Sequence, residues 1–402
     1  MATSNHPERA GIDLLDGRFY ADEPHAHFDW MRANAPVYWD RASSLWGVSL
    51  HEDIMMMSRD ATTFSNAQGM RPEYPAVDMM ICMDDPEHKV RRNLVNRGFT
   101  KNRVERLEPK VRAVCRELID AAMERGRFDF VREIAAPLPM IMIGDMLGVP
   151  PDARGDLLRW SDDMMKGMTG LKYLTEEAGA AMMQAGEEYR QYVTETIVAR
   201  RTDRSIDDLM GILTHAEVDG ARLDEEAISQ ESLLILIGGD ETTRHVISGG
   251  MHALLEHPEQ LAALREDPTK LPVAIEEMLR WVSPIKNMAR TLTRDVELRG
   301  QTLEEGEKLL LLYPSGNRDE RVFDRPHEFD ITRTPNDHVA FGGYGTHFCL
   351  GASLARLELR VMFEELLDRL GEIALTDEAR PVERPANFVV GFEEMWVEVA
   401  HG

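Results

Sequence analysis

The chain has 402 residues, of which 43% are hydrophobic and 29% are charged, and its formal net charge at pH 7 is −25. A chain of this length can bury a large core, and so negative a charge argues against nucleic acid as a general partner. The three cysteines lie far apart, at 82, 115 and 349, which argues against a disulfide framework and for a reducing cytoplasm.

The sequence gives no sign of a membrane segment or of separate domains. The longest apolar runs, 233–237 and 309–313, are far too short to span a bilayer, and the polar N-terminus is unlike a signal peptide. No linker rich in Pro, Gly or Ser and no internal repeat is found. We therefore expect a cytoplasmic protein without a membrane span, built from a flexible segment at 1–16 and one large domain at 17–402.

The hydrophobic pattern predicts a mainly α fold with small β-sheets. The expected elements, in chain order, are strands at 37–39 and 45–48, helical segments at 86–126, 160–201, 224–257 and 272–281, strands at 296–298 and 309–312, and a last helix that begins at 349. Asp224 can cap the start of the long helix, and Pro258 closes it. At about 1.5 Å per residue that helix spans roughly 50 Å, the width of a whole domain.

One segment has a charge opposite to that of the whole chain. Between His88 and Arg112 there are nine Lys or Arg residues and only two acids. A local positive face on an acidic protein predicts the docking of an acidic partner, steered by charge. The alternative is a solvated helix face without a partner.

Two adjacent glycines, Gly238 and Gly239, lie inside the long helix, although each costs about 1 kcal/mol relative to alanine. Something must therefore need space there. The hydroxyl of Thr242 can bond back to the Gly238 carbonyl, which bends helices. We expect a local widening with room for a diatomic ligand and a water. Beside it, an acid, Glu241, and an alcohol, Thr242, can pass protons.

Near the C-terminal end a glycine-rich loop, 341–351, delivers Cys349 to the start of an amphipathic pattern. Free N–H groups and the dipole at a helix start lower the pKa of a cysteine, so this position favours a thiolate. The glycines let a flat ligand lie close to the backbone. The arrangement suggests haem iron held by one sulfur. A zinc site with His347 and Cys349 is the alternative, but no second Cys or His pair has zinc spacing.

The loop resembles the signature of the cytochrome P450 superfamily, the haem-thiolate monooxygenases. The matching residues are Phe341, Gly342, Gly345, His347, Cys349 and Gly351. Phe341 lies eight residues before the cysteine instead of the common seven, which resembles a glycine-doublet form found in some actinobacterial lipid and sterol oxidisers. Residues 238–242 are similar to the superfamily's oxygen-activation motif. The resemblance implies a single-domain fold with the haem between the long central helix and the helix after the cysteine.

The resemblance also implies roles for single residues. Cys349 is the metal ligand of haem b (iron protoporphyrin IX), and Phe341 and Gly351 lie beside the cofactor. Glu241 and Thr242 are the catalytic pair. Gly238 opens the oxygen groove, and Asp240 falls at a variable position and has no catalytic role.

Further residues match supporting parts of the family. Glu277 and Arg280 resemble a buried structural lock, with Arg333 as its third member. The two haem propionates would be held by cations, for each of which a surface or docking role is the alternative. The implied cations are His88, Arg92, Arg290 and His347.

The 24 methionines are consistent with an adaptable apolar site. The family topology implies a sizeable, greasy pocket with few polar contacts. For any single methionine, ordinary core is the alternative. The implied substrate-binding residues are Met79, Met80, Met168, Leu233, Ile237, Ile285, Met288 and Val389.

A more specific resemblance, through residues 233–245, 278–281, 286–288 and 380–390, is to the actinobacterial family that oxidises the terminal carbon of the cholesterol side chain. It implies hydroxylation of a steroid such as cholesterol or cholestenone with O2 and two electrons. These would come from NAD(P)H through ferredoxin reductase and ferredoxin, and we expect a monomer. A fatty acid, terpene or macrolide-type substrate, a peroxide-driven oxygenase, and a haem ligand-binding protein without turnover are the alternatives. The acid–alcohol pair argues against the last two.

Overall fold

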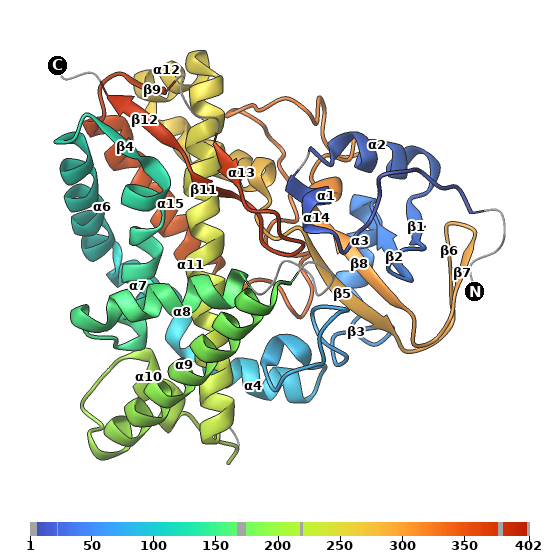
Figure 1. Ribbon diagram of the computed structural model, residues 1–402, viewed down its shortest axis with the longest axis horizontal. Coiled ribbons are helices and arrows are strands. Elements are labelled where there is room, and N and C mark those ends of the chain that lie inside the picture. Colours follow the sequence, from blue (N-terminus) through green and yellow to red (C-terminus); the bar gives the residue numbers. More distant parts are fainter. Residues whose placement is uncertain (1–5, 22, 167–173, 218–219, 377–380, 400–402) are drawn as a thin grey trace.

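The computed structural model describes residues 6–21, 23–166, 174–217, 220–376 and 381–399. Helices dominate the fold and the sheets are small, as the sequence predicted. Figure 1 shows most of the helices gathered on one side of the molecule, with α11 running through them. The largest sheet, with α1 to α3, lies on the other side.

The longer elements follow the predicted order. The helices are α1 (Gly17–Ala21), α2 (His25–Asn34), α3 (His51–Arg59), α4 (Glu87–Val95), α5 (Lys101–Arg106), α6 (Glu108–Met123), α7 (Pro137–Leu147), α8 (Arg154–Lys166), α9 (Glu176–Thr202), α10 (Leu209–His215), α11 (Glu225–Glu256), α12 (Pro258–Glu266), α13 (Leu271–Val282), α14 (Tyr313–Gly316) and α15 (Ala352–Arg369). The strands are β1 (Val37–Asp40), β2 (Leu45–Val48), β3 (Phe64–Ser65), β4 (Arg127–Asp129), β5 (Asn287–Leu292), β6 (Val296–Leu298), β7 (Gln301–Leu303), β8 (Lys308–Leu312), β9 (Ile373–Leu375), β10 (Val382–Glu383), β11 (Phe392–Glu394) and β12 (Trp396–Val399).

The long helix α11 begins and ends where the sequence predicted. The Asp224 side chain accepts a hydrogen bond from the backbone N–H of Ala227 (2.8 Å) and so caps the helix start. The helix ends at Glu256, and Pro258 begins α12. The helix is continuous across the two central glycines, so the expected widening does not take the form of a break.

Glycines let two other helices approach α11 closely. A Cβ atom at Gly239 would lie 2.9 Å from Cδ1 of Ile143 in α7, and one at Gly250 would lie 2.9 Å from Sδ of Met278 in α13. At Gly238, by contrast, no heavy atom lies within 4 Å of the Cβ position. The two central glycines therefore serve different purposes: Gly239 serves packing and Gly238 leaves open space.

The main core joins α6, α11, α13 and α15 to the sheet β4-β12-β9. The five-stranded sheet has the order β1-β2-β8-β5-β3, in which only β2 and β8 run parallel. Strand β5 was not predicted as a strand, because Asn-Met-Ala-Arg-Thr-Leu alternates poorly between polar and apolar residues. It pairs with β8 and places Met288 and Arg290 in the interior of the protein.

The N-terminal segment 1–16 was predicted to be flexible, and its described part, 6–16, contacts the rest of the fold. His6 Nε2 accepts a hydrogen bond from the backbone N–H of Trp39 (2.8 Å), and the N–H of Leu14 donates to Asp40 (2.7 Å). Leu14 is fully buried. Residues 6–16 thus pack against β1, because apolar side chains at Ile12 and Leu14 find a place in the core.

The basic segment 88–112 is less free than its composition indicated. Several of its cations pair with acids of other elements: Arg91 with Asp78, Arg103 with Asp207, Lys110 with Asp145, and Arg112 with Glu364 and Glu365. Lys89 and Arg106 are exposed. The positive face is therefore smaller than predicted, because folding brings acids from distant parts of the chain next to it.

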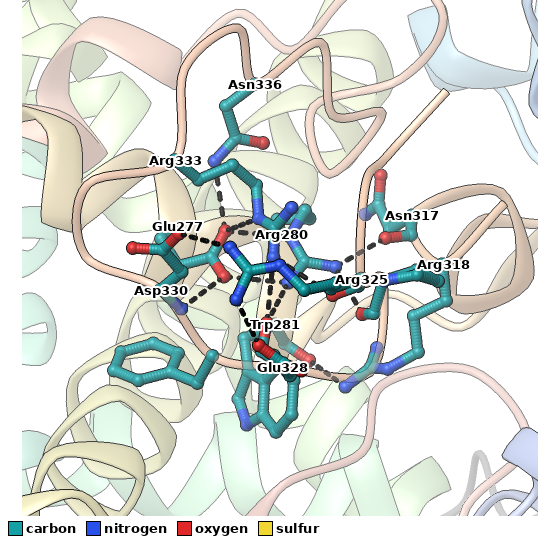
Figure 2. A network of polar contacts seen from close by, with 12 residues as sticks. Glu277, Arg280, Trp281, Asn317, Arg318, Arg325, Glu328, Asp330, Arg333 and Asn336 are labelled. Carbon is teal, nitrogen blue, oxygen red and sulfur yellow. Dashed lines mark hydrogen bonds and ion pairs between the residues drawn. The ribbon is translucent and has the colours of Figure 1, made fainter. Parts of the chain in front are cut away.

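The predicted lock is confirmed, and Figure 2 shows its geometry. Both carboxylate oxygens of Glu277 accept from Arg280, each at 2.7 Å, and Oε2 also accepts from Nε of Arg333 (3.0 Å). The two arginines donate further to backbone carbonyls between 317 and 328. The lock fixes the irregular chain that leads into the cysteine loop.

Candidate active site

A cavity of about 220 Å³ lies between α11 and the loop that precedes α15. Gly238, Thr242 and Thr243 line it from α11, and Cys349 and Gly351 line it from the loop. The sequence motifs at 238–242 and 341–351, about a hundred residues apart in the chain, therefore face one another across one space.

Cys349 is exposed and lines this cavity. Its backbone N–H donates to the Phe341 carbonyl (3.0 Å), which closes the loop. Helix α15 begins at Ala352, three residues later than predicted. Burial raises the pKa of the Cys349 thiol, and the N–H groups of Gly351 and Ala352, with Arg92, offset only part of this. Burial therefore opposes the lowering of the Cys349 pKa by the N–H groups at the helix start.

A bound metal would reverse this balance, because a coordinating thiol is deprotonated outright. Across the described ranges, no group of three His, Cys, Asp or Glu side chains is placed to hold a metal ion. A metal on Cys349 would suit a group that brings further ligands of its own. Iron in a porphyrin meets this requirement, since the ring supplies four nitrogens.

The glycines of the loop have two purposes. A Cβ atom at Gly343 or Gly345 would overlap Ser58 at the end of α3, so these two let the loop lie against that helix. Gly342 has a φ of +89°, which favours glycine. Only Gly351 has open space at the Cβ position and lines the cavity. The predicted close approach of a flat ligand therefore applies to Gly351.

The four cations expected at the haem propionates line this same cavity. The rings of His88 and His347 lie 4.1 Å apart between centroids, and Nε2 of each is buried without a hydrogen-bond partner among the described residues. Arg92 donates to the Phe348 carbonyl (2.5 Å), and Arg290 donates to the Ala289 carbonyl (2.7 Å).

Burial lowers the pKa of all four groups, and for His347, which also faces His88, Arg290 and Arg92, it falls to about 2. Two adjacent buried histidine nitrogens without a partner, in a cavity that two arginines also line, are a poor arrangement for an empty site. They fit a ligand that carries carboxylates there, as haem does.

Sequence reasoning missed several residues at the cavity, among them the polar Tyr313 and Glu358. Tyr313, which follows β8, lines it and hydrogen-bonds the Arg290 side chain. Glu358 on α15 lines it too, and burial together with the charge of Asp240 raises its pKa to about 8. Tyr313 ends the apolar run 309–313 and Glu358 lies in the predicted last helix, but neither pattern shows which of its residues face a cavity.

Thr242 behaves as predicted: its hydroxyl donates to the Gly238 carbonyl at 2.7 Å, and it lines the cavity. Glu241 is fully buried and does not line the cavity. Its Oε2 accepts from Nη2 of Arg244 (2.7 Å) and lies 3.7 Å from Nη1 of Arg384. Burial acts to raise the pKa of Glu241, but Arg244, Arg384 and His245 lower it below the ordinary value.

The neighbouring Asp240 is fully buried and accepts a hydrogen bond from Ser161 (3.0 Å). Burial and the charge of Glu241 raise the pKa of Asp240. The pKa values of the two adjacent acids are thus shifted in opposite directions: the close pair with Arg244 prevails at Glu241, whereas burial and the charge of Glu241 prevail at Asp240 despite Arg244.

The predicted substrate residues fall into three groups. Met80, Ile285 and Met288 line the cavity. Others are packed next to its wall without lining it: Met79, Leu233, Ile237 and Val389. From α11, Leu234 and Ile235 line the cavity instead of Leu233 and Ile237, because the helix turns by about 100° per residue. Met168 lies outside the described residues.

Fold and site together define a helical protein with a haem-type cavity, and a comparison with protein families agrees. The family model described as Cytochrome P450 matches residues 55–390. The chain belongs to the cytochrome P450 family.

Curated relatives are similar over almost their whole length. The Steroid C26-monooxygenase of Mycobacterium tuberculosis is 51% identical over 96% of this chain and 97% of that protein. The enzyme of the same name from Mycolicibacterium smegmatis is 49% identical over 96% of each. A solved cytochrome P450 of Mycobacterium marinum, in complex with pseudoionone, superposes with a TM-score of 0.89 at 34% identity, over 98% of this chain and 100% of that one.

Membership of the family confirms the predicted class of enzyme. The protein is a monooxygenase that uses haem-thiolate iron and O2, acts on a hydrophobic substrate and takes electrons from redox partners. None of the described helices has the length and apolar character needed to cross a membrane.

Proposed function

We propose that the protein hydroxylates the terminal carbon of a steroid side chain, with cholesterol or cholestenone as the type of substrate. The observation that carries this proposal is an apolar cavity between Thr242 and Cys349, walled by Met80, Ile285 and Met288. The curated relatives that are about half identical over nearly the full chain are named for steroid oxidation at C26, which supports the same chemistry here.

In this proposal Cys349 holds the haem iron, and Phe341 and Gly351 lie against the ring. Arg356 supports this position of Phe341, since its guanidinium lies 4.6 Å from the centre of that ring. His88, Arg92, Arg290 and His347 hold the propionates. When bound, the haem supplies the activation of O2 and the transfer of one oxygen atom to carbon.

The proposed work of the chain's own residues is proton handling and orientation. Gly238 leaves space beside α11 for a small ligand, and the Thr242 hydroxyl donates its one hydrogen into that space when it turns away from the Gly238 carbonyl. When its carboxylate leaves Arg244, Glu241 takes up a proton from water and passes that proton to Thr242. The low pKa that Arg244 imposes on Glu241 keeps this acid ionised until it moves.

We also propose a route for the electrons and a location for the protein. Electrons come from NAD(P)H through a ferredoxin reductase and a ferredoxin, which docks near the exposed Lys89 and Arg106. A single haem-binding domain at 17–402 acts as a monomer in the cytoplasm. The three free cysteines support a reducing compartment.

A ligand titration of the haem-loaded protein tests the substrate class. Cholestenone, a long-chain fatty acid and a terpene are added in turn while the haem absorption band is followed. We expect cholestenone to shift the band at the lowest concentration. If another scaffold shifts it and no steroid does, the steroid proposal is wrong, although the enzyme class stands.

A further inference from the structure

Glu231 is a buried acid on α11 that lies outside the haem and oxygen residues. Its side chain has no exposed surface. Oε1 accepts a hydrogen bond from the backbone N–H of Met80 (2.7 Å) and lies 3.4 Å from Nη1 of Arg91. Oε2 is buried and has no partner among the described residues. A carboxylate has therefore been removed from water chiefly to hold the backbone of a distant loop.

Arg91 extends this contact to a third element. It lies on α4, and its Nη2 reaches both carboxylate oxygens of Asp78, at 3.0 and 3.2 Å. Asp78 precedes Met80 by two residues in the same loop. Glu231 and Arg91 thus fasten residues 78–80 to α11 and α4 at the same time.

The fastened segment forms part of the cavity wall. Met80 and Ile81 line the cavity, and the Ile81 carbonyl accepts from Nδ2 of Asn66 (3.1 Å). The preceding residues 75–78 are exposed, with 40% of the Val77 side chain accessible. The wall therefore continues directly into a solvent-exposed stretch of the loop, and the Met80 amide is the point where the loop meets α11.

We propose that Glu231 is a positioning residue of the substrate wall. Through the Met80 amide and through Arg91, it fixes residues 78–81 against α11 and so sets the width of the cavity beside Met80. The inference rests on the proposed function only for the statement that substrate fills this cavity. The fixing of the loop is independent of it.

Hydrogen exchange of the haem-loaded protein, without substrate, tests the fixing directly. In Glu231→Leu the Met80 amide loses its acceptor, and we expect exchange across 77–83 to become about tenfold faster or more. Glu226→Gln, an exposed acid on the same helix, is the matched control and should leave the exchange unchanged. The proposal is overturned if the amides of 77–83 exchange equally fast in Glu231→Leu and in the parent protein. It is also overturned if the exchange rate rises uniformly across the whole chain.

A variant with a milder change covers the case in which Glu231→Leu does not fold. Arg91→Met removes the link to Asp78 from a partly exposed position and should speed exchange at 77–83 by roughly threefold, because one of two contacts remains. No change in this variant contradicts the role of Arg91 and overturns the proposal as stated.

Ligand affinity tests the effect on the wall. In Glu231→Leu we expect cholestenone to bind about three- to tenfold more weakly, while imidazole, a small ligand of haem iron, keeps its affinity within about twofold. Equal losses for both ligands would indicate a damaged haem site and would contradict a role at the wall. If the parent protein binds no steroid, the proposed function fails, and hydrogen exchange alone decides the inference.

Discussion

At the scale of single residues, the site is built from neighbours with opposite surroundings. Thr242 faces the cavity, and Glu241, one residue earlier, faces Arg244 and Arg384 in a buried ion-pair network. Successive residues on a helix point about 100° apart, which lets Glu241 face the arginines while Thr242 faces the cavity. Proton transfer between them requires a side chain to move.

Replacement of Thr242 tests the importance of its hydroxyl. Thr242→Val keeps the shape but removes the donor to Gly238, and we expect product formation per NADPH consumed to fall by about 10²-fold, the usual contribution of a positioned proton donor. Thr242→Ser keeps the hydroxyl and should retain most of the product formed per NADPH consumed. The two are compared by product yield and NADPH use, with the carbon monoxide spectrum as the check on haem binding. If Thr242→Val forms as much product per NADPH as the parent protein, the Thr242 hydroxyl is not a required proton donor.

The lock gives a prediction on stability. Glu277→Gln leaves Arg280 and Arg333 buried without a counter-charge, and we expect a loss of about 3–5 kcal/mol in the free energy of unfolding. Glu328→Gln, which weakens an exposed pair with Arg325, should change it by less than about 1 kcal/mol. Denaturant unfolding of the two variants measures both. Similar values for the two would show that the lock does not support the fold.

Glu231 gives a prediction on pH dependence. Burial raises its pKa from 4.5 to about 7, against the Met80 N–H and Arg91, with Asp78 adding to the rise. An acid whose pKa is higher in the folded than in the unfolded state stabilises the fold fully below its unfolded-state pKa. This stabilisation is lost as the pH rises through the folded-state pKa, here about 7. Over this pH range the contribution of Glu231 to the free energy of unfolding falls by roughly 3 kcal/mol. Between pH 5 and 8 the parent protein should therefore lose stability relative to Glu231→Gln; parallel pH profiles would contradict this.

At the scale of elements, close packing on α11 determines where the cavity can form. Gly239 and Gly250 let α7 and α13 touch the helix backbone, and Gly238 alone leaves a gap. Strand β5 then brings Met288 and Arg290 to the same space from the sheet side. The cavity lies where α11, β5 and the cysteine loop meet.

Two alanine substitutions separate the roles of the paired glycines. Gly238→Ala has room for a methyl group and improves helix propensity, so we expect it to raise the free energy of unfolding by up to about 1 kcal/mol. Gly239→Ala forces its methyl group to within 2.9 Å of Ile143 and should lower stability by about 1–2 kcal/mol. Thermal unfolding of the two holoproteins measures the contrast. The reverse order would show that Gly238 is the packing residue.

At the scale of the whole molecule, charge is distributed unevenly. The net charge is −25, yet the exposed Lys89 and Arg106 lie in a basic segment that also contains the cavity-lining His88 and Arg92. If the electron carrier is acidic, as proposed, most of the surface repels it and this region attracts it.

Reversal of these charges tests the docking of a ferredoxin. The double variant Lys89→Glu and Arg106→Glu should reduce the rate of haem reduction by ferredoxin about tenfold at low salt, and the difference should shrink at high salt. Lys270→Glu, on a distant turn before α13, serves as the control. Reduction is followed by stopped-flow absorbance. An unchanged rate in the double variant would place docking elsewhere.

The sequence by itself determined the parts that local chemistry dictates. Local interactions set the cap of α11 at Asp224 and the hydrogen bond from Thr242 to Gly238. Specific family spacing predicted the Glu277 lock with Arg333 and the meeting of the cysteine loop with the glycine motif. Only the tertiary structure decided how side chains divide between cavity and core. Leu234 replaces Leu233 at the wall, acids far away in the chain neutralise much of the basic segment, and burial outweighs the helix start at Cys349. Each of these outcomes depends on burial or on charges brought together from distant parts of the chain. The residues adjacent in sequence determine neither of these.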